Sequence, residues 1–176
     1  MSKQKQKIDN PHKRKMEKLK KNIDASINAA NRQRGIGILL TGNGKGKSTS
    51  AFGMVIRSLG YNYKVGIVQF IKGQQLSGEE IYIRDKCPSV TFHQMSTGFT
   101  WETQDRSIDI AAAEKSWSKA EKMLKDDNYH LIVLDELTYM LSFKYLDEDK
   151  VIHALKHRPT HQSVVVTGRG GGAALK

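Results

Sequence analysis

The stretch TGNGKGKST, residues 41–49, constrains the fold more than any other part of the sequence. An apolar run over residues 36–40 precedes it, and a helical pattern over residues 48–59 follows and ends at Gly60. Strand, glycine-rich turn and helix form the setting in which a loop binds phosphate. Successive backbone N–H groups converge there, and the helix N-terminus adds a partial positive charge. The sequence therefore predicts a phosphate-binding loop in an α/β domain.

Within this loop, Lys47 is expected to reach the phosphates and the Ser48 hydroxyl to bind Mg²⁺, or Mn²⁺ in its place. The glycines let the backbone turn tightly and approach phosphate oxygens. The pattern departs from G-x-x-x-x-G-K-[ST], because Thr41 stands where a glycine is expected. The alternative is a glycine-rich turn with incidental lysines. The predicted phosphate-binding residues are Gly42, Asn43, Gly44, Lys45, Gly46, Lys47, Ser48 and Thr49.

Four further apolar segments have the composition of buried strands, and helical patterns separate them. The strands are expected over residues 64–72, 90–95, 130–136 and 162–167, and the helices over residues 81–86, 107–125 and 147–157. This alternation is typical of a parallel sheet with helices on both faces. We therefore expect an α/β fold: a three-layer P-loop NTPase (RecA-like) domain with a mostly parallel sheet. Trp117 falls on the apolar face of its helix and is predicted to be a core residue.

Charged residues close two of these strands. Residues 130–136 end in Asp135 and Glu136. A carboxylate at the end of a buried strand is the partner that a phosphate-binding loop needs beside Mg²⁺. In an ATPase, the second acid would orient the attacking water. Arg169 follows the last strand and is expected at the same edge of the sheet, where it can pair with phosphate.

The segment over residues 96–105 carries two large aromatic side chains, Phe99 and Trp101. Aromatic residues in a loop favour a flat or apolar ligand. The alternative is ordinary packing of both rings against the domain.

The first 33 residues differ in composition from the rest. Residues 1–10 are expected to be disordered, and a lysine-rich helix is predicted from Pro11. One face of this helix carries an apolar stripe, which has four possible docking partners: its own domain, a second subunit, a membrane or nucleic acid. Docking on protein is the favoured interpretation, and residues 34–176 are expected to form the P-loop domain. The apolar stripe of the helix consists of Met16, Leu19, Ile23, Ile27 and Ala30.

The formal charge of +11 indicates an anionic partner, although much of the excess lies in the first 35 residues. The single cysteine, Cys87, excludes an internal disulfide framework. The sequence shows neither an apolar run of transmembrane length nor a signal-peptide pattern. We expect a cytoplasmic protein with neither a membrane nor a nucleic acid as partner.

Five blocks of sequence together resemble a known family. RGIGILLTGNGKGKST, VGIVQFIKG, TGFTWETQ, LDELTYM and TGRG occur in the order and spacing of the ATP:corrinoid adenosyltransferases of the bacterial CobA, CobO and BtuR type. The resemblance covers residues 34–170. It implies an enzyme that transfers the 5′-deoxyadenosyl group of ATP to a reduced corrinoid (cob(I)alamin, cobinamide or cobyrinic acid a,c-diamide). Triphosphate is released, and the product serves adenosylcobalamin biosynthesis or salvage.

The resemblance also implies residue roles. Residues 43–49 would hold ATP, Glu136 and Ser48 the metal ion, and Arg169 the nucleotide. Phe99 and Trp101 would face the corrin and exclude its lower axial ligand, so with Lys47 they form the expected catalytic set. The N-terminal helix would close over the site, in a homodimer. An electron donor such as a reduced flavin or a flavodoxin would reduce the cobalt.

Relatives continue beyond the GRG block through a further helix and strand, so this chain is expected to be truncated at its C-terminus. Two other functions compete with the transferase. One is a P-loop ATPase or small-molecule kinase, with Glu136 activating water or a hydroxyl and ADP as product. The other is a RecA-like nucleic-acid-binding protein that uses the basic N-terminus and binds with a steep salt dependence.

Overall fold

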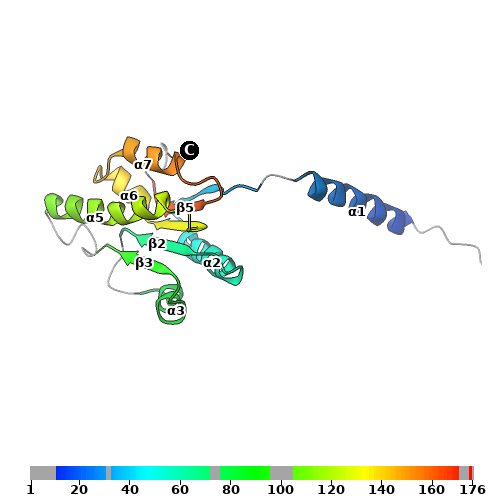
Figure 1. Ribbon diagram of the computed structural model, residues 1–176, viewed down its shortest axis with the longest axis horizontal. Helices are drawn as coiled ribbons and strands as arrows, with labels where there is room; N and C mark the ends of the chain where they lie inside the picture. Colours follow the sequence, from blue (N-terminus) through cyan, green and yellow to red (C-terminus); the bar gives the residue numbers. More distant parts are fainter. Residues whose placement is uncertain (1–10, 31–32, 72–75, 96–104, 171–174, 176) are drawn as a thin grey trace, which may run out of the picture. The chain divides into compact units, whose positions relative to one another are not determined.

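The computed structural model describes residues 11–30, 33–71, 76–95, 105–170 and 175. The chain divides into two units, residues 1–33 and residues 34–176 (Figure 1). The predicted aromatic residues Phe99 and Trp101 lie outside the described residues.

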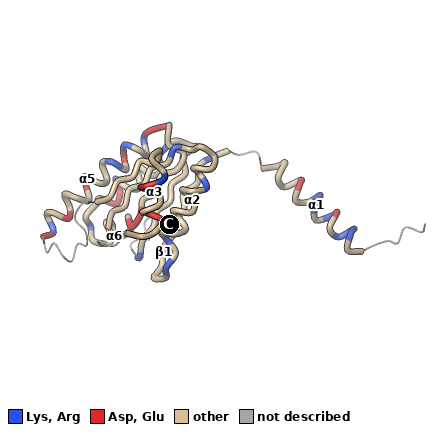
Figure 2. Tube along the Cα trace, turned by 90° about the horizontal axis from the view of Figure 1, so that it is seen from below, with Lys and Arg blue, Asp and Glu red and all other residues tan. Residues whose placement is uncertain are grey.

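Helix α1 (Pro11–Ala29) makes up the described part of the first unit. None of its residues is buried, and its lysine and arginine residues all lie in the N-terminal part, residues 13–21 (Figure 2). Its larger apolar side chains are 41–64% exposed, so the apolar stripe is open along the whole helix. The exposed members are Met16, Leu19, Ile23 and Ile27.

The second unit is built on a five-stranded sheet with the order β1-β5-β4-β2-β3. Every neighbouring pair of strands is parallel, which confirms the expected sheet type. The strands are β1 (Gly37–Thr41), β2 (Val65–Gln69), β3 (Thr91–Gln94), β4 (Leu131–Asp135) and β5 (Ser163–Gly168).

Helices cover both faces of the sheet, so the three-layer prediction is confirmed (Figure 1). One face packs against α2 (Lys47–Gly60) and α3 (Gly78–Lys86). The other packs against α5 (Arg106–Lys125), α6 (Leu137–Ser142) and α7 (Glu148–Lys156). The short helix α6 is an element that the sequence pattern did not predict.

Alternation along the central strands builds the two cores. In β4, Leu131 and Val133 join the core under α2, whereas Ile132 and Leu134 join the core under α5. Both sets are buried, which explains why the strands read as continuous apolar runs. Trp117 of α5 is 1% exposed, which confirms its prediction as a core residue.

The parallel arrangement brings the carboxyl ends of the strands to one edge. Thr41 of β1 is in register with Gly168 of β5, and Gln69 of β2 with Asp135 of β4. Loops and side chains at this edge of an open α/β sheet form its usual ligand site. The glycine-rich loop and both acids of residues 135–136 therefore converge there.

Candidate active site

The loop between β1 and α2 has the backbone that phosphate binding requires. Gly42 and Gly46 have φ angles of 123° and 100°, which an L side chain rarely adopts. A Cβ atom added at either position would meet nothing within 4 Å, so backbone conformation rather than space selects glycine here. Gly46 caps α2, and its carbonyl accepts from Ser50 N at 2.8 Å. The predicted order of strand, loop and helix is confirmed.

The Lys47 side chain folds back over this loop. Its Nζ atom donates hydrogen bonds to Gly42 O at 2.7 Å and to Gly44 O at 2.6 Å. The ammonium group is therefore held inside the turn, where the loop N–H groups also concentrate positive potential. Its charge acts on the neighbouring strand end as well, because it lowers the pKa of Glu136 against the other influences on that carboxyl.

Asp135 is the acid that the loop contacts directly. Ser48 Oγ donates to Asp135 Oδ1 at 2.8 Å, and the Asp135 side chain is 1% exposed. Two further side chains donate to it: Thr167 Oγ1 to Oδ1 at 2.6 Å, and Gln69 Nε2 to Oδ2 at 2.8 Å. Sequence reasoning assigned the metal to Ser48 and Glu136, named Asp135 only as one of the two acids at the strand end, and gave Gln69 and Thr167 no role. The sequence feature that could have identified these residues is the polar residue near the end of each buried apolar strand.

Glu136 stands beside this cluster in an unusual backbone conformation. Its φ and ψ are 59° and 25°, and its N–H donates to Thr167 Oγ1 at 2.9 Å. The Oε2 atom is buried and has no hydrogen-bond partner within the described residues. Burial raises the pKa of this carboxyl, and the Asp135 charge adds to the rise, while Lys47 and Arg169 oppose it.

Arg169 follows Gly168, the last residue of β5, and its side chain is exposed. Gly168 has a φ of 148°, and a Cβ atom there would lie 2.0 Å from Thr138 Oγ1 of α6. Only glycine therefore lets the chain pass α6 and bring Arg169 to this edge. The guanidinium lies close enough to influence the pKa of Glu136. Lys47, Ser48, Glu136 and Arg169 thus gather at one edge, as the sequence predicted.

The oxygen ligands at this edge fit a magnesium ion bound to phosphates. They are the Ser48 hydroxyl, the Asp135 carboxylate beneath it and the buried, unpartnered Glu136 Oε2. The described residues contain no group of three or more His, Cys, Asp or Glu side chains that could hold a metal on their own. A phosphate-bound Mg²⁺ needs no such cage, because one or two carboxylates, the phosphates and water supply its ligands.

Thr49 links the loop helix to α3. Its Oγ1 donates to Glu79 Oε1 at 2.6 Å; Thr49 is exposed and Glu79 is half-buried. The N-terminus of α3 is fixed independently by Ser77, whose side chain accepts from Glu80 N. The acidic first turn of α3 therefore lies against the phosphate-binding loop.

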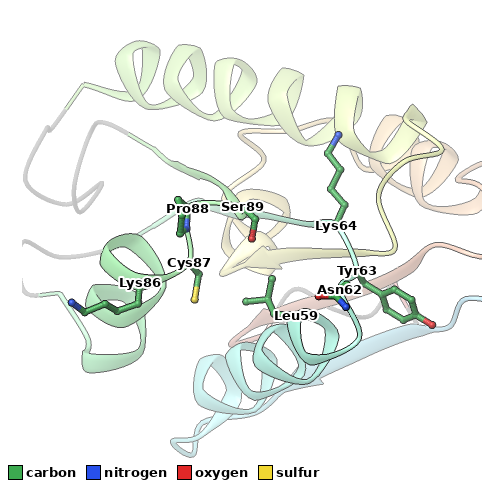
Figure 3. Close-up of a pocket in the computed structure, with 8 residues that line it drawn as sticks. All are labelled: Leu59, Asn62, Tyr63, Lys64, Lys86, Cys87, Pro88 and Ser89. Carbon is green, nitrogen blue, oxygen red and sulfur yellow. The ribbon is translucent and has the colours of Figure 1, made fainter.

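A separate cavity of about 440 Å³ lies at the other end of α2 (Figure 3). Leu59, Asn62 and Cys87 are among its lining residues. The Lys64 ammonium is directed away from it, pairs with Asp126 at 3.6 Å and lies over the Tyr129 ring. The loop, the two acids and Arg169 are absent from its lining, so this cavity is not the nucleotide site.

The fold and the site define a P-loop NTPase-like protein. The family described as ATP:corrinoid adenosyltransferase BtuR/CobO/CobP matches residues 33–176. The chain belongs to this family. No helix among the described residues has the length and apolar character needed to cross a membrane.

Individual relatives are similar over most of their length. A corrinoid adenosyltransferase of Pseudomonas aeruginosa is 50% identical over 162 residues, covering 92% of this chain and 80% of the relative. One from Salmonella typhimurium, named corrinoid adenosyltransferase CobA, is 46% identical, covering 92% of this chain and 82% of the relative. One from Escherichia coli strain K12 is 44% identical with the same coverage.

Proposed function

We propose that this protein transfers the 5′-deoxyadenosyl group of ATP to the cobalt of a reduced corrinoid and releases triphosphate. The product would serve adenosylcobalamin biosynthesis or salvage. The observation that carries the proposal is the site itself: the Lys47–Ser48 pair of the loop meets the Asp135–Glu136 pair at one edge of the sheet. The family and its 44–50% identical relatives give the reaction type.

In this reaction the cobalt(I) centre attacks C5′ of the ribose. A Co–C bond forms, the C5′–O bond breaks, and the electron pair of that bond leaves with the triphosphate. The protein needs to align the two reactants and to stabilise charge on the leaving group. Lys47 and Arg169 supply positive charge, and the loop N–H groups supply donors.

A bound Mg²⁺ would neutralise part of the triphosphate charge, and Mn²⁺ could take its place. Ser48, Asp135 and Glu136 would hold it. All three phosphates leave together, so the loop has to bind the whole chain rather than direct one terminal phosphoryl group. A loop that departs from the common pattern at Thr41 is compatible with that task.

Phe99 and Trp101 are proposed to face the corrin and to keep its lower axial ligand away from the cobalt. This role rests on the TGFTWETQ block of the sequence. We also propose a cytoplasmic homodimer in which α1 lays its open apolar stripe against protein, and an electron donor such as a reduced flavin or a flavodoxin. The exposure of Met16, Leu19, Ile23 and Ile27 along that stripe supports a protein partner for α1.

The proposal is tested by incubating the protein with ATP, Mg²⁺ and chemically reduced cobalamin. We expect the absorption spectrum of a light-sensitive Co–C product and one triphosphate released per product. An ATPase or kinase would release ADP and form no Co–C bond. Formation of ADP without alkylated corrinoid would therefore contradict the proposed function.

A further inference from the structure

The Asp135 carboxylate accepts hydrogen bonds from both neighbouring strands of the sheet. Strand β4, which carries Asp135, lies between β5 and β2. Thr167 of β5 donates to Oδ1, and Gln69 of β2 donates to Oδ2. Both donors are almost fully buried, with exposed fractions of 0% for Thr167 and 1% for Gln69. A buried carboxylate whose two oxygens are held by neighbouring strands has a single orientation available to it.

The Thr167 hydroxyl acts on both acids. It has one proton, which it donates to Asp135 Oδ1, and it accepts the N–H of Glu136 at 2.9 Å. The backbone of Glu136 is thereby fixed in its left-handed conformation, which is uncommon for a residue other than glycine. One side chain thus sets the position of both carboxylates at the site.

The hydrogen bonds from Thr167 and Gln69 to Asp135 also determine which way the Ser48 hydroxyl faces. Ser48 Oγ has one proton and donates it to Asp135 Oδ1. Its lone pairs then face away from Asp135 and can accept a cation. A carboxylate free to rotate would leave this hydroxyl free to rotate as well.

We propose that Thr167 and Gln69 are positioning residues for cation-assisted ATP binding: they fix Asp135, and through it the Ser48 hydroxyl, in the arrangement that receives the metal. This inference rests on the proposed function, because it concerns the same nucleotide site. Neither residue belongs to the loop, and both act through Asp135. Gln69 has a second feature, since its buried Oε1 has no partner within the described residues and remains an available acceptor beside the carboxylate.

The test compares ATP affinity in Mg²⁺ with ATP affinity in EDTA, by calorimetric titration without corrinoid. For Thr167→Val, which keeps the β-branched shape that a strand prefers, we expect the ratio of the two affinities to fall about tenfold. Thr167→Ser restores the hydroxyl and should restore the ratio. Gln69→Leu should lower it in the same direction. Binding in EDTA should stay close to that of the parent in every variant.

Thr91→Val is the matched control. Thr91 also bonds through its hydroxyl, to Tyr129 Oη at 2.8 Å, but it lies at the opposite end of the sheet and pairs in register with Gly66. Its variant should keep the ratio of the parent. Circular dichroism confirms the fold of each variant, and if Thr167→Val does not fold, Gln69→Leu decides.

Two results would overturn the inference. One is an unchanged Mg²⁺-to-EDTA ratio in folded Thr167→Val and Gln69→Leu. The other is an equal loss of affinity in both media, which is the sign of a purely structural role. These ratios are independent of the transfer assay. A parent protein that binds ATP with Mg²⁺ but forms no Co–C product would therefore refute the proposed function alone.

Discussion

Ser48 Oγ and Asp135 Oδ1 are joined by a hydrogen bond of 2.8 Å, although 87 positions separate the two residues in the sequence. This bond connects the phosphate-binding loop to the end of the central strand β4. Asp135 accepts hydrogen bonds from three side chains, whereas the adjacent Glu136 has a buried oxygen without a partner within the described residues. The two neighbouring acids should therefore respond to substitution in opposite ways.

Asp135→Asn is expected to destabilise the protein. The amide that replaces one carboxylate oxygen is itself a donor and would face Ser48, Thr167 or Gln69, which all donate to this side chain. Leaving buried polar groups unpaired costs about 1–3 kcal/mol each. Denaturant unfolding should show this loss, and Mg²⁺-dependent transfer should fall with it. A variant as stable as the parent would contradict the three hydrogen bonds that we describe at Asp135.

Glu136→Gln is expected to stabilise the free protein at neutral pH. Burial, aided by Asp135, raises the pKa of Glu136 in the folded state. Its charged form is therefore disfavoured by folding, and the parent loses stability as the pH rises from the ordinary glutamate pKa through the raised one. The melting temperature of the variant should exceed that of the parent at neutral pH and match it at about pH 4 and below.

The same Glu136→Gln variant should use ATP less well with Mg²⁺, because a neutral amide is a poorer ligand for this ion. Greater stability combined with lower activity is the result expected if the Glu136 carboxylate destabilises the fold but takes part in Mg²⁺-dependent ATP use. Transfer equal to that of the parent at saturating ATP and Mg²⁺ would remove Glu136 from the metal site.

Lys47→Ala should abolish transfer and leave the fold intact. Within the described residues the ammonium donates hydrogen bonds to two loop carbonyls, Gly42 O and Gly44 O, and the side chain is half-buried at the sheet edge. Loss of a preorganised charge at the leaving group typically lowers turnover by about 10²-fold or more. Steady-state kinetics and circular dichroism measure the two effects. Lys156→Ala, at an exposed position of α7, is the control and should behave as the parent.

Gly168→Ala is expected to lower stability and to displace Glu136, although Gly168 is not among the residues proposed to bind a ligand. The added methyl group would lie 2.0 Å from Thr138 Oγ1 and push α6, whose N-cap is Glu136, away from β5. Overpacking of this kind costs about 1–3 kcal/mol, and the unfavourable φ adds to the loss. The control is Gly53→Ala, in the exposed surface of α2, where a Cβ atom meets nothing within 4 Å. This control should gain about 0.5–1 kcal/mol, so a comparable gain for Gly168→Ala would refute the close contact.

Phe99 and Trp101 lie outside the described residues, and their role is tested by changing both to alanine. If they face the corrin, the melting temperature should barely move. Transfer should survive better when cobalt(I) is supplied ready-made than when it starts from cobalt(II) with a weak reductant, because only the second route requires displacement of the axial ligand. If they are core residues, each truncation should cost about 3–5 kcal/mol, with equal losses of activity by both routes.

Much of this architecture follows from local pattern. The apolar runs at Val164–Val166 and Leu131–Leu134, which are rich in Val and Ile, predicted buried strands, and the glycine-rich loop predicted its own position between strand and helix. Helix α6 was not predicted, because six residues with four buried side chains show no amphipathic period. The left-handed conformation of Glu136 was equally invisible, since it depends on Thr167 from another strand.

Some site residues could likewise be predicted from local sequence, whereas others depend on the strand order. Lys47 and Ser48 belong to a contiguous motif, so sequence spacing was sufficient to predict them as phosphate and metal contacts. Gln69, Asp135 and Thr167 acquire their roles only from the strand order, which places β4 between β2 and β5. A single polar residue at the end of an apolar strand is common, and its partner across the sheet cannot be derived from the strand alone.

The strand order also has a consequence for how the protein acquires its activity during folding. β1, which leads into the loop, is an edge strand whose neighbour in the sheet is β5, the last described strand in the chain. Pairing of such distant segments is slow, because the conformational entropy of a long loop is lost before any stabilising contact forms. A nascent chain that has not yet reached residue 163 has the complete glycine-rich loop but no partner for its strand. We therefore expect a nascent chain that lacks β5 to bind ATP more weakly than the complete chain, because the strand that leads into its loop is not yet paired.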